Sequence, residues 1–155
     1  MRLLLRSWEK FSGVLNFNKD RREVCTMLAD IGKYLQDKSI ATLGTDLFLG
    51  FTPDQPDNCI SLFEYAGFSP DLHSNVEYPV LQVRVRDENY SDAADKIRRV
   101  MKCLHGLHEQ TLSGTRYLLI KAQGSPEALK RNQDDLIEMI VEFEILKETN
   151  FPDDE

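Results

Sequence analysis

Three side chains near the middle of the chain are of types that bind transition metals: Cys103, His105 and His108. Thiolate and imidazole groups are zinc ligands, and a helix would bring positions 105 and 108 to neighbouring faces. Gly106 interrupts such a helix, and the sequence offers no fourth ligand of the kind that structural zinc needs. We therefore expect no metal ion and no cofactor. The histidines are interpreted as side chains at a helix C-terminus, where they favour the helix dipole.

Paired carboxylates are the second candidate for chemistry, since Glu138, Glu142 and Glu144 are close enough in sequence for acid–base work. They alternate with apolar residues, however, and this alternation is typical of a strand with one wet side. We interpret them as a solvated acidic sheet face. Arg84 and Arg86, on another predicted strand, are candidate partners for these glutamates, within the sheet or across a subunit boundary.

Motifs for nucleophilic catalysis and phosphate binding are missing from the sequence. It has no Gly-x-Ser-x-Gly elbow, no catalytic cysteine signature and no glycine-rich phosphate loop. We therefore predict no catalytic residues and no enzyme activity. Cys25, Cys59 and Cys103 are odd in number and far apart, so they predict core positions in a reducing environment and no disulfide framework.

Composition indicates one soluble globular domain. The chain has 155 residues, of which 41% are hydrophobic and 29% are charged. No apolar run approaches the roughly 20 residues that cross a bilayer, so no membrane partner is expected. The net charge of −7 argues against specific nucleic-acid binding by the globular part, which would need a basic face.

The most informative span is Cys59–Arg86, which predicts two strands joined by a long connection. The first strand covers Cys59–Tyr65 and the second covers Tyr78–Arg86, where apolar and polar residues alternate strictly. The connection, Ala66–Asn75, is too long for a tight hairpin and carries apolar residues, a combination typical of a contact surface. Candidate assembly-interface residues in this span are Phe68, Asp71, Leu72, His73, Tyr78, Arg84 and Arg86.

The remaining elements follow from periodicity and punctuation. A helix is expected from Asp20, with Asp20 and Glu23 as a capping box, to about Lys38. Further elements are a strand at Asp46–Phe51, a helix at Asn89–His105, a strand at Thr115–Ala122, a loop at 123–133 with a helical turn at Pro126–Lys130, and a strand at Asp135–Lys147. The predicted fold class is α+β, a mostly antiparallel sheet of about five strands with two main helices packed on one face.

Domain organisation is expected to be simple. Residues 1–19 are an N-terminal extension, for which a disordered segment and a short amphipathic helix are both open. Residues 20–148 form the α+β domain, and residues 149–155 are an acidic tail.

Several motifs in one order resemble the phage minor capsid proteins of the tail terminator type, over about residues 22–148. The motifs are Leu47-Phe48-Leu49-Gly50-Phe51, the run from Pro56 to Gly67, the run from Tyr78 to Arg86, Leu104-His105-Gly106-Leu107, and the run from Gly114 to Ile120. The resemblance implies a virion structural protein, located at the head–tail junction and assembled in the bacterial host cytoplasm.

Such proteins form a homo-oligomeric ring, commonly a hexamer, that stops growth of the tail tube. The resemblance therefore implies three partners: further copies of the chain, the tail tube protein, and the head completion or connector protein. DNA passes through the centre of the ring, and the acidic face with Glu138, Glu142 and Glu144 is a candidate lining of that lumen. The alternative is an α+β protein-binding or regulatory module, encoded by a prophage, that binds through the same sheet face.

Overall fold

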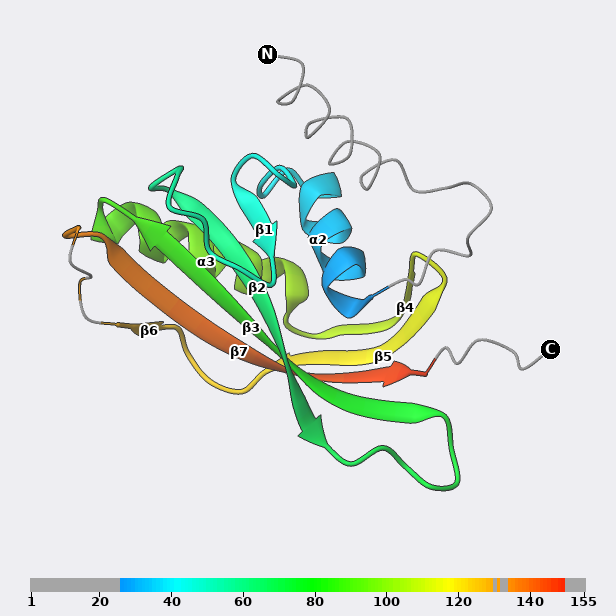
Figure 1. Cartoon of the computed structure of the whole chain (residues 1–155). Helices are drawn as coiled ribbons and strands as arrows, with labels where there is room; N and C mark the ends of the chain where they lie inside the picture. Colours follow the sequence, from blue (N-terminus) through cyan, green and yellow to red (C-terminus); the bar gives the residue numbers. More distant parts are fainter. Residues whose placement is uncertain (1–25, 130, 132–133, 150–155) are drawn as a thin grey trace, which may run out of the picture.

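The computed structural model of the chain describes residues 26–129, 131 and 134–149 (Figure 1). Two helices and seven strands lie within these ranges. Their bounds are α2 Met27–Asp37, β1 Leu47–Leu49, β2 Cys59–Phe68, β3 Val76–Asp87, α3 Tyr90–Leu104, β4 Leu107–Leu112, β5 Thr115–Ala122, β6 Glu127–Ala128 and β7 Ile137–Glu148.

The strands form one sheet in the order β1-β2-β3-β7-β5-β4, and β6 pairs with β7 beside β5. The β1–β2 pair is parallel and every other pair is antiparallel. The α+β class and the mostly antiparallel sheet are thereby confirmed. The expected count of about five strands is too low, because β4 and β6 add to the sheet.

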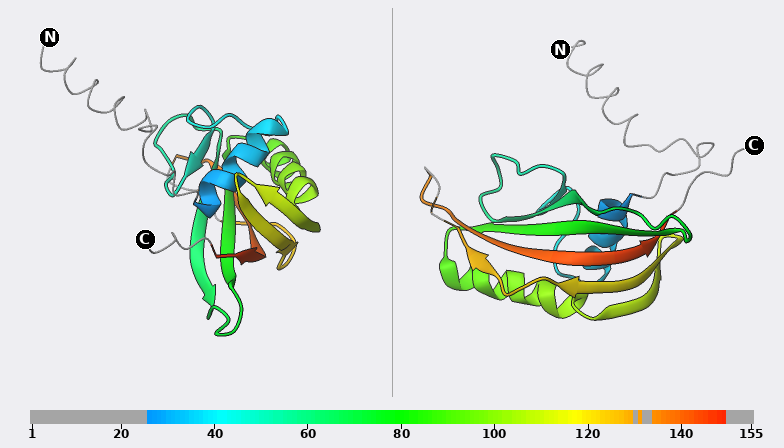
Figure 2. Two further views of the ribbon diagram at one scale, coloured as in Figure 1. Left: turned by 90° about the vertical axis from the view of Figure 1, so that its right-hand side faces the viewer. Right: turned by 90° about the horizontal axis from the view of Figure 1, so that it is seen from below.

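Sheet and helices share one apolar core. Leu81, Val83 and Val85 of β3 are fully buried, as their alternation predicted, and Phe143 of the neighbouring β7 is buried beside them. Helix α3 packs against β3, β7 and β5, whereas α2 packs against β1, β2 and β4. Figure 2 shows that the sheet curls strongly, and the two helices pack against different strands of it. The expectation that both helices lie on one face of the sheet therefore stays a prediction.

Helix α2 begins at Met27, and Thr26 is its N-cap: the Thr26 hydroxyl accepts a hydrogen bond from the Ala29 amide at 3.2 Å. The predicted capping box at Asp20 and Glu23 lies outside the described residues. Helix α3 begins at Tyr90, and Asn89 is its N-cap: the Asn89 side chain accepts a hydrogen bond from the Ser91 amide at 2.9 Å.

Two strands differ from the expectations. Strand β4 follows α3 directly after Gly106, which has a φ of +84°, and it pairs with β5. Its residues are mostly exposed and polar, so no apolar alternation marked them as a strand. The helical turn expected at Pro126–Lys130 is wrong, because Glu127 and Ala128 pair with Ile140 and Met139 of β7.

Candidate assembly surface

The most prominent surface feature is a projecting β-hairpin, residues 64–78, called the hairpin arm below. Its two strands are the end of β2 and the start of β3, which extend beyond the core (Figure 1). The expected connection at Ala66–Asn75 is therefore shorter, because β2 continues to Phe68. Strand β1 covers the edge of β2 only from Ile60 to Leu62. Within the described residues, the β2 edge from Phe63 to Phe68 has no strand beside it.

A bulge in the hairpin arm depends on Gly67. The β2–β3 register runs from Tyr65 opposite Val80 to Phe68 opposite Tyr78, so β2 holds an extra residue there. Gly67 has a φ of +65°, and a Cβ atom at this position would lie 1.9 Å from the Tyr78 carbonyl oxygen. A side chain does not fit, so the bend of the hairpin arm requires glycine.

Asp71 organises the tip of the hairpin arm. Its carboxylate accepts hydrogen bonds from the His73 amide at 3.0 Å and from the Ser74 hydroxyl at 2.9 Å. These bonds lower the pKa of Asp71, the backbone bond from His73 being the main cause. The Asp71 amide in turn donates to the Val76 carbonyl at 3.2 Å. Asp71 therefore stabilises the conformation of the loop between β2 and β3 through hydrogen bonds within the hairpin arm.

Apolar side chains are presented on the hairpin arm. Phe68 is 70% exposed and Leu72 is 93% exposed, and Tyr65 beside them is also exposed. A shallow hollow of about 310 Å³ lies along the arm, with Tyr78 half-buried in its lining. The structure thus brings the candidates Phe68, Leu72 and Tyr78 onto one projection. Tyr65 was not singled out in the sequence, although it stands two residues from Phe63 on the same strand face.

A polar network crosses the sheet face that carries Arg84. Gln82 is at its centre: its Nε2 donates to Glu142 at 2.9 Å, and its Oε1 accepts from Arg84 at 2.7 Å and from Tyr65 at 3.3 Å. The Arg84 guanidinium also lies 4.9 Å from the centre of the Phe63 ring. Arg84 and Glu142, expected to meet, are therefore joined through Gln82.

The acidic face of β7 has the predicted alternation. Glu138, Glu142 and Glu144 are half-buried, whereas the residues between them on the other face are buried. Glu138 stands opposite Arg86 and Glu144 opposite Val80 in the pairing with β3. The glutamates thus share one strip of surface with the network around Gln82.

Arg86 has a different environment from the other candidates, because it is 9% exposed and bound to backbone. Its guanidinium donates to the carbonyl oxygens of Pro53 at 2.7 Å, Asp54 at 3.4 Å, Pro56 at 2.8 Å and Asp57 at 2.9 Å. Arg86 therefore fastens the 51–58 loop to the sheet. Its guanidinium is not available to a glutamate of another subunit in this arrangement.

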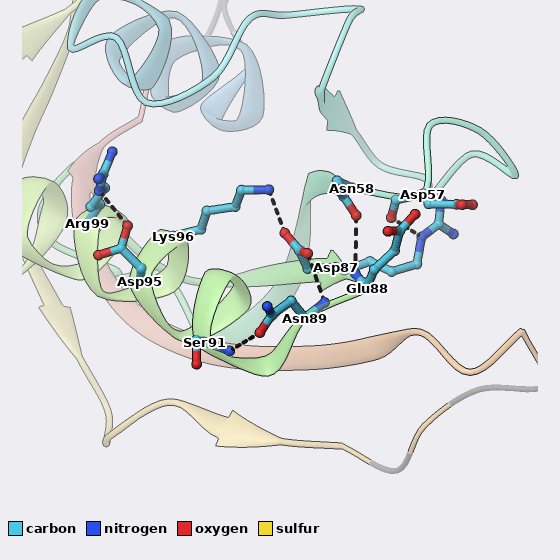
Figure 3. Close-up of polar contacts among 10 residues, drawn as sticks. Asp57, Asn58, Asp87, Glu88, Asn89, Ser91, Asp95, Lys96 and Arg99 are labelled. Carbon is cyan, nitrogen blue, oxygen red and sulfur yellow. Dashed lines mark hydrogen bonds and ion pairs between the residues drawn. The ribbon is translucent and has the colours of Figure 1, made fainter.

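The corner between β3 and α3 is held by a chain of polar contacts (Figure 3). Asp87 is buried; it accepts a hydrogen bond from the Asn89 amide at 3.0 Å and forms an ion pair with Lys96 at 2.7 Å. Asn58 accepts from the Glu88 amide at 3.1 Å. These contacts set the direction in which α3 leaves the sheet.

The histidines considered as metal ligands bind backbone groups. His105 accepts a hydrogen bond from the Ala122 amide at 3.0 Å, and His108 Nδ1 lies 3.0 Å from the Gly106 carbonyl oxygen. Among the residues described, no three His, Cys, Asp or Glu side chains gather as a metal site. Burial raises the pKa of the Cys59 thiol, which keeps it protonated.

No helix in the described part of the chain is long and apolar enough to cross a membrane. The family model described as bacteriophage tail terminator protein matches residues 34–149. A solved structure described as the virion of a native gene transfer agent (GTA) particle contains a similar chain, with a TM-score of 0.64 and 16% sequence identity. The similarity covers 79% of this chain and 95% of that one, and at this identity it shows the fold alone. No curated protein matches the chain.

Proposed function

Since the chain belongs to the bacteriophage tail terminator protein family, we propose that it caps the phage tail tube as an oligomeric ring and joins the tail to the head. The observation that carries the proposal is the family match, which spans most of the chain including the hairpin arm. The family is structural, which suggests a protein that acts through contacts and not as an enzyme. The proposed location of the protein is the head–tail junction of the virion.

The proposed ring is a hexamer of this chain. A closed ring needs two different patches of one subunit to meet, so that each subunit contacts two neighbours. The hairpin arm supplies one such patch, because Phe68, on an open strand edge, and Leu72, in the loop at the tip, are both exposed. The tail tube protein and the head completion or connector protein are the proposed partners on the two sides of the ring.

The proposed lumen lining is the acidic strip with Glu138, Glu142 and Glu144. Negative side chains repel the phosphate backbone, so DNA would pass through such a ring without specific binding. We expect that a variant with all three glutamates replaced by glutamine still forms the proposed ring. We also expect this variant to be retained more strongly than the wild type on immobilised double-stranded DNA at low salt. Equal retention of both proteins would contradict the lumen assignment.

The test of the proposed function uses the purified full chain and purified tail tube protein. We expect rings in negative-stain electron micrographs and a light-scattering mass that is a multiple of the chain mass. We also expect tube growth to stop at shorter lengths when the chain is added. A chain that neither forms rings nor changes tube length would contradict the proposal and favour the prophage-encoded binding module.

A further inference from the structure

A hollow of about 410 Å³ lies between helices α2 and α3. Tyr34, Ile40 and Cys103 supply its uncharged lining. The other lining residues, Lys38, Arg99 and Lys102, are all cationic and exposed. The hollow therefore combines an apolar floor with a basic rim, and it is called the basic hollow below.

The rim keeps its positive charge available. Arg99 forms an ion pair with Asp95 at 2.9 Å, but both side chains are more than half exposed and such pairs are weak. Lys38 lies over the Tyr34 ring, 5.6 Å from its centre. No carboxylate pairs with Lys38 or Lys102 within the described ranges. The chain as a whole carries a net charge of −7, so the positive charge of this rim is opposite in sign to the net charge of the protein.

The hairpin arm has the opposite character. Residues 64–78 contain Glu64, Asp71 and Glu77 and no lysine or arginine. Glu77 pairs with Lys147 at 3.0 Å, whereas Asp71, next to Leu72 at the tip, is exposed and makes no ion pair among the described residues. The exposed apolar side chains of Phe68 and Leu72 lie on the same hairpin. The hairpin arm thus carries exposed apolar and acidic side chains, which are complementary to the apolar floor and the basic rim of the basic hollow.

We propose that the hairpin arm of one subunit inserts into the basic hollow of a second copy of this chain, with Leu72 against Cys103 and the neighbouring Asp71 near the rim lysines. The inference rests on the proposed function and specifies the contact that would hold the ring together. Figure 1 shows the hairpin arm extending away from α2 and α3, so the chain does not fill its own hollow. Contacts between unlike patches of this kind are heterologous, and they close into a ring when the rotation from one subunit to the next is a whole fraction of a turn.

Cysteine cross-linking tests this contact directly, because Cys103 is a free cysteine. The test protein is the full chain with Cys25→Ser and Leu72→Cys, oxidised mildly over a range of protein concentrations. We expect a ladder of covalent oligomers on non-reducing gels, which collapses on reduction. Adding Cys103→Ser should abolish the ladder, and Gln110→Cys, on the exposed strand β4, should give none in place of Leu72→Cys.

Charge reversal gives an independent measurement. Lys102→Glu should raise the dissociation constant of the assembly at least about tenfold, the factor that about 1.4 kcal/mol represents. Thermal unfolding of each variant checks that the fold is retained.

The outcomes separate this inference from the proposed function. Rings that form without a link between positions 72 and 103, and whose dissociation constant Lys102→Glu leaves unchanged, overturn the arm-in-hollow contact and leave the tail terminator proposal standing. A chain that stays monomeric at every concentration, forms no ladder and does not bind tail tubes overturns both. A link that forms only with tail tubes present supports a contact that the tail templates.

Discussion

The Tyr117 hydroxyl donates a hydrogen bond to Asp30 Oδ2 across 2.7 Å, and both side chains are buried. This contact ties helix α2 to strand β5, which are far apart in the chain. Desolvation by burial raises the pKa of Asp30, and the hydrogen bonds from Tyr117 and Thr115 offset part of that rise. The buried pair therefore couples the docking of α2 to protonation.

The first prediction concerns the pH dependence of stability. Because the pKa of Asp30 is higher in the folded state than its ordinary value of 3.8, the folded state binds more protons there. The contribution of Asp30 to the free energy of unfolding is complete below pH 3.8 and is lost as the pH rises through the folded-state pKa. Asp30→Asn should remove this decline in urea unfolding followed from pH 3.5 to 8. Asp37→Asn, at an exposed position of the same helix, is the control and should keep the wild-type dependence.

The second prediction concerns the bulge in the hairpin arm. Gly67→Ala places a methyl group against the Tyr78 carbonyl and a side chain at positive φ, at a cost of about 1–3 kcal/mol. The backbone of the arm must shift, so limited proteolysis should cut between residues 66 and 76 faster than in the wild type. Gly124→Ala is the matched control, since its Cβ meets no atom within 4 Å and its φ is not positive. Equal cleavage of both variants would show that the bulge is dispensable.

The third prediction concerns the Arg86 contacts. Arg86→Met removes the four guanidinium hydrogen bonds to carbonyl oxygens of the 51–58 loop, so these carbonyl groups lose a charged partner. We expect the free energy of unfolding to fall by about 1.5–3 kcal/mol, measured by chemical denaturation. Arg131→Gln breaks an exposed ion pair with Asp135 and should change it by less than about 1 kcal/mol. A small effect of Arg86→Met would mean that water replaces the guanidinium.

The fourth prediction separates assembly from folding. The double change Phe68→Ser and Leu72→Ser alters exposed side chains, so the free energy of unfolding should stay within about 0.5 kcal/mol of the wild type. Ring formation and the effect on tail tube length should be lost. Tyr90→Ser alters another exposed aromatic residue, at the start of α3, and should leave assembly intact. Rings formed by the double variant would exclude the hairpin arm from the interface.

Local patterns predicted most of the strands well. Thr115–Ala122 was correct at both ends, and the alternation around Val83 and Phe143 located two central strands and their buried faces. Strand β4 was missed because its polar residues bury little surface, so its place depends on pairing with β5. The insertion of β7 between β3 and β5 is a long-range choice that no local pattern contains.

The candidate surface was also predictable only in part, because some of its contacts join residues that are far apart in the sequence. Exposure of Phe68 and Leu72 followed from apolar residues in a turn-rich connection. Arg86 resembled Arg84 in sequence, yet its partners are carbonyl oxygens of a loop about thirty positions away. Every residue has a carbonyl oxygen whatever its side chain, so the spacing of residue types in the sequence did not reveal which carbonyl groups bind Arg86. The basic hollow was missed because its cations are far apart in the sequence, Lys38 being the C-cap of α2 whereas Arg99 and Lys102 belong to α3.

Strand β3 carries the hairpin arm at one end and the Asp87–Lys96 corner at the other. Its 12 residues, at roughly 3.3 Å each, give a separation of about 40 Å. Mobile ions at physiological strength screen exposed charges beyond about 8 Å. At about five times that distance, a change of charge in the hairpin arm leaves the Asp87–Lys96 pair unaltered.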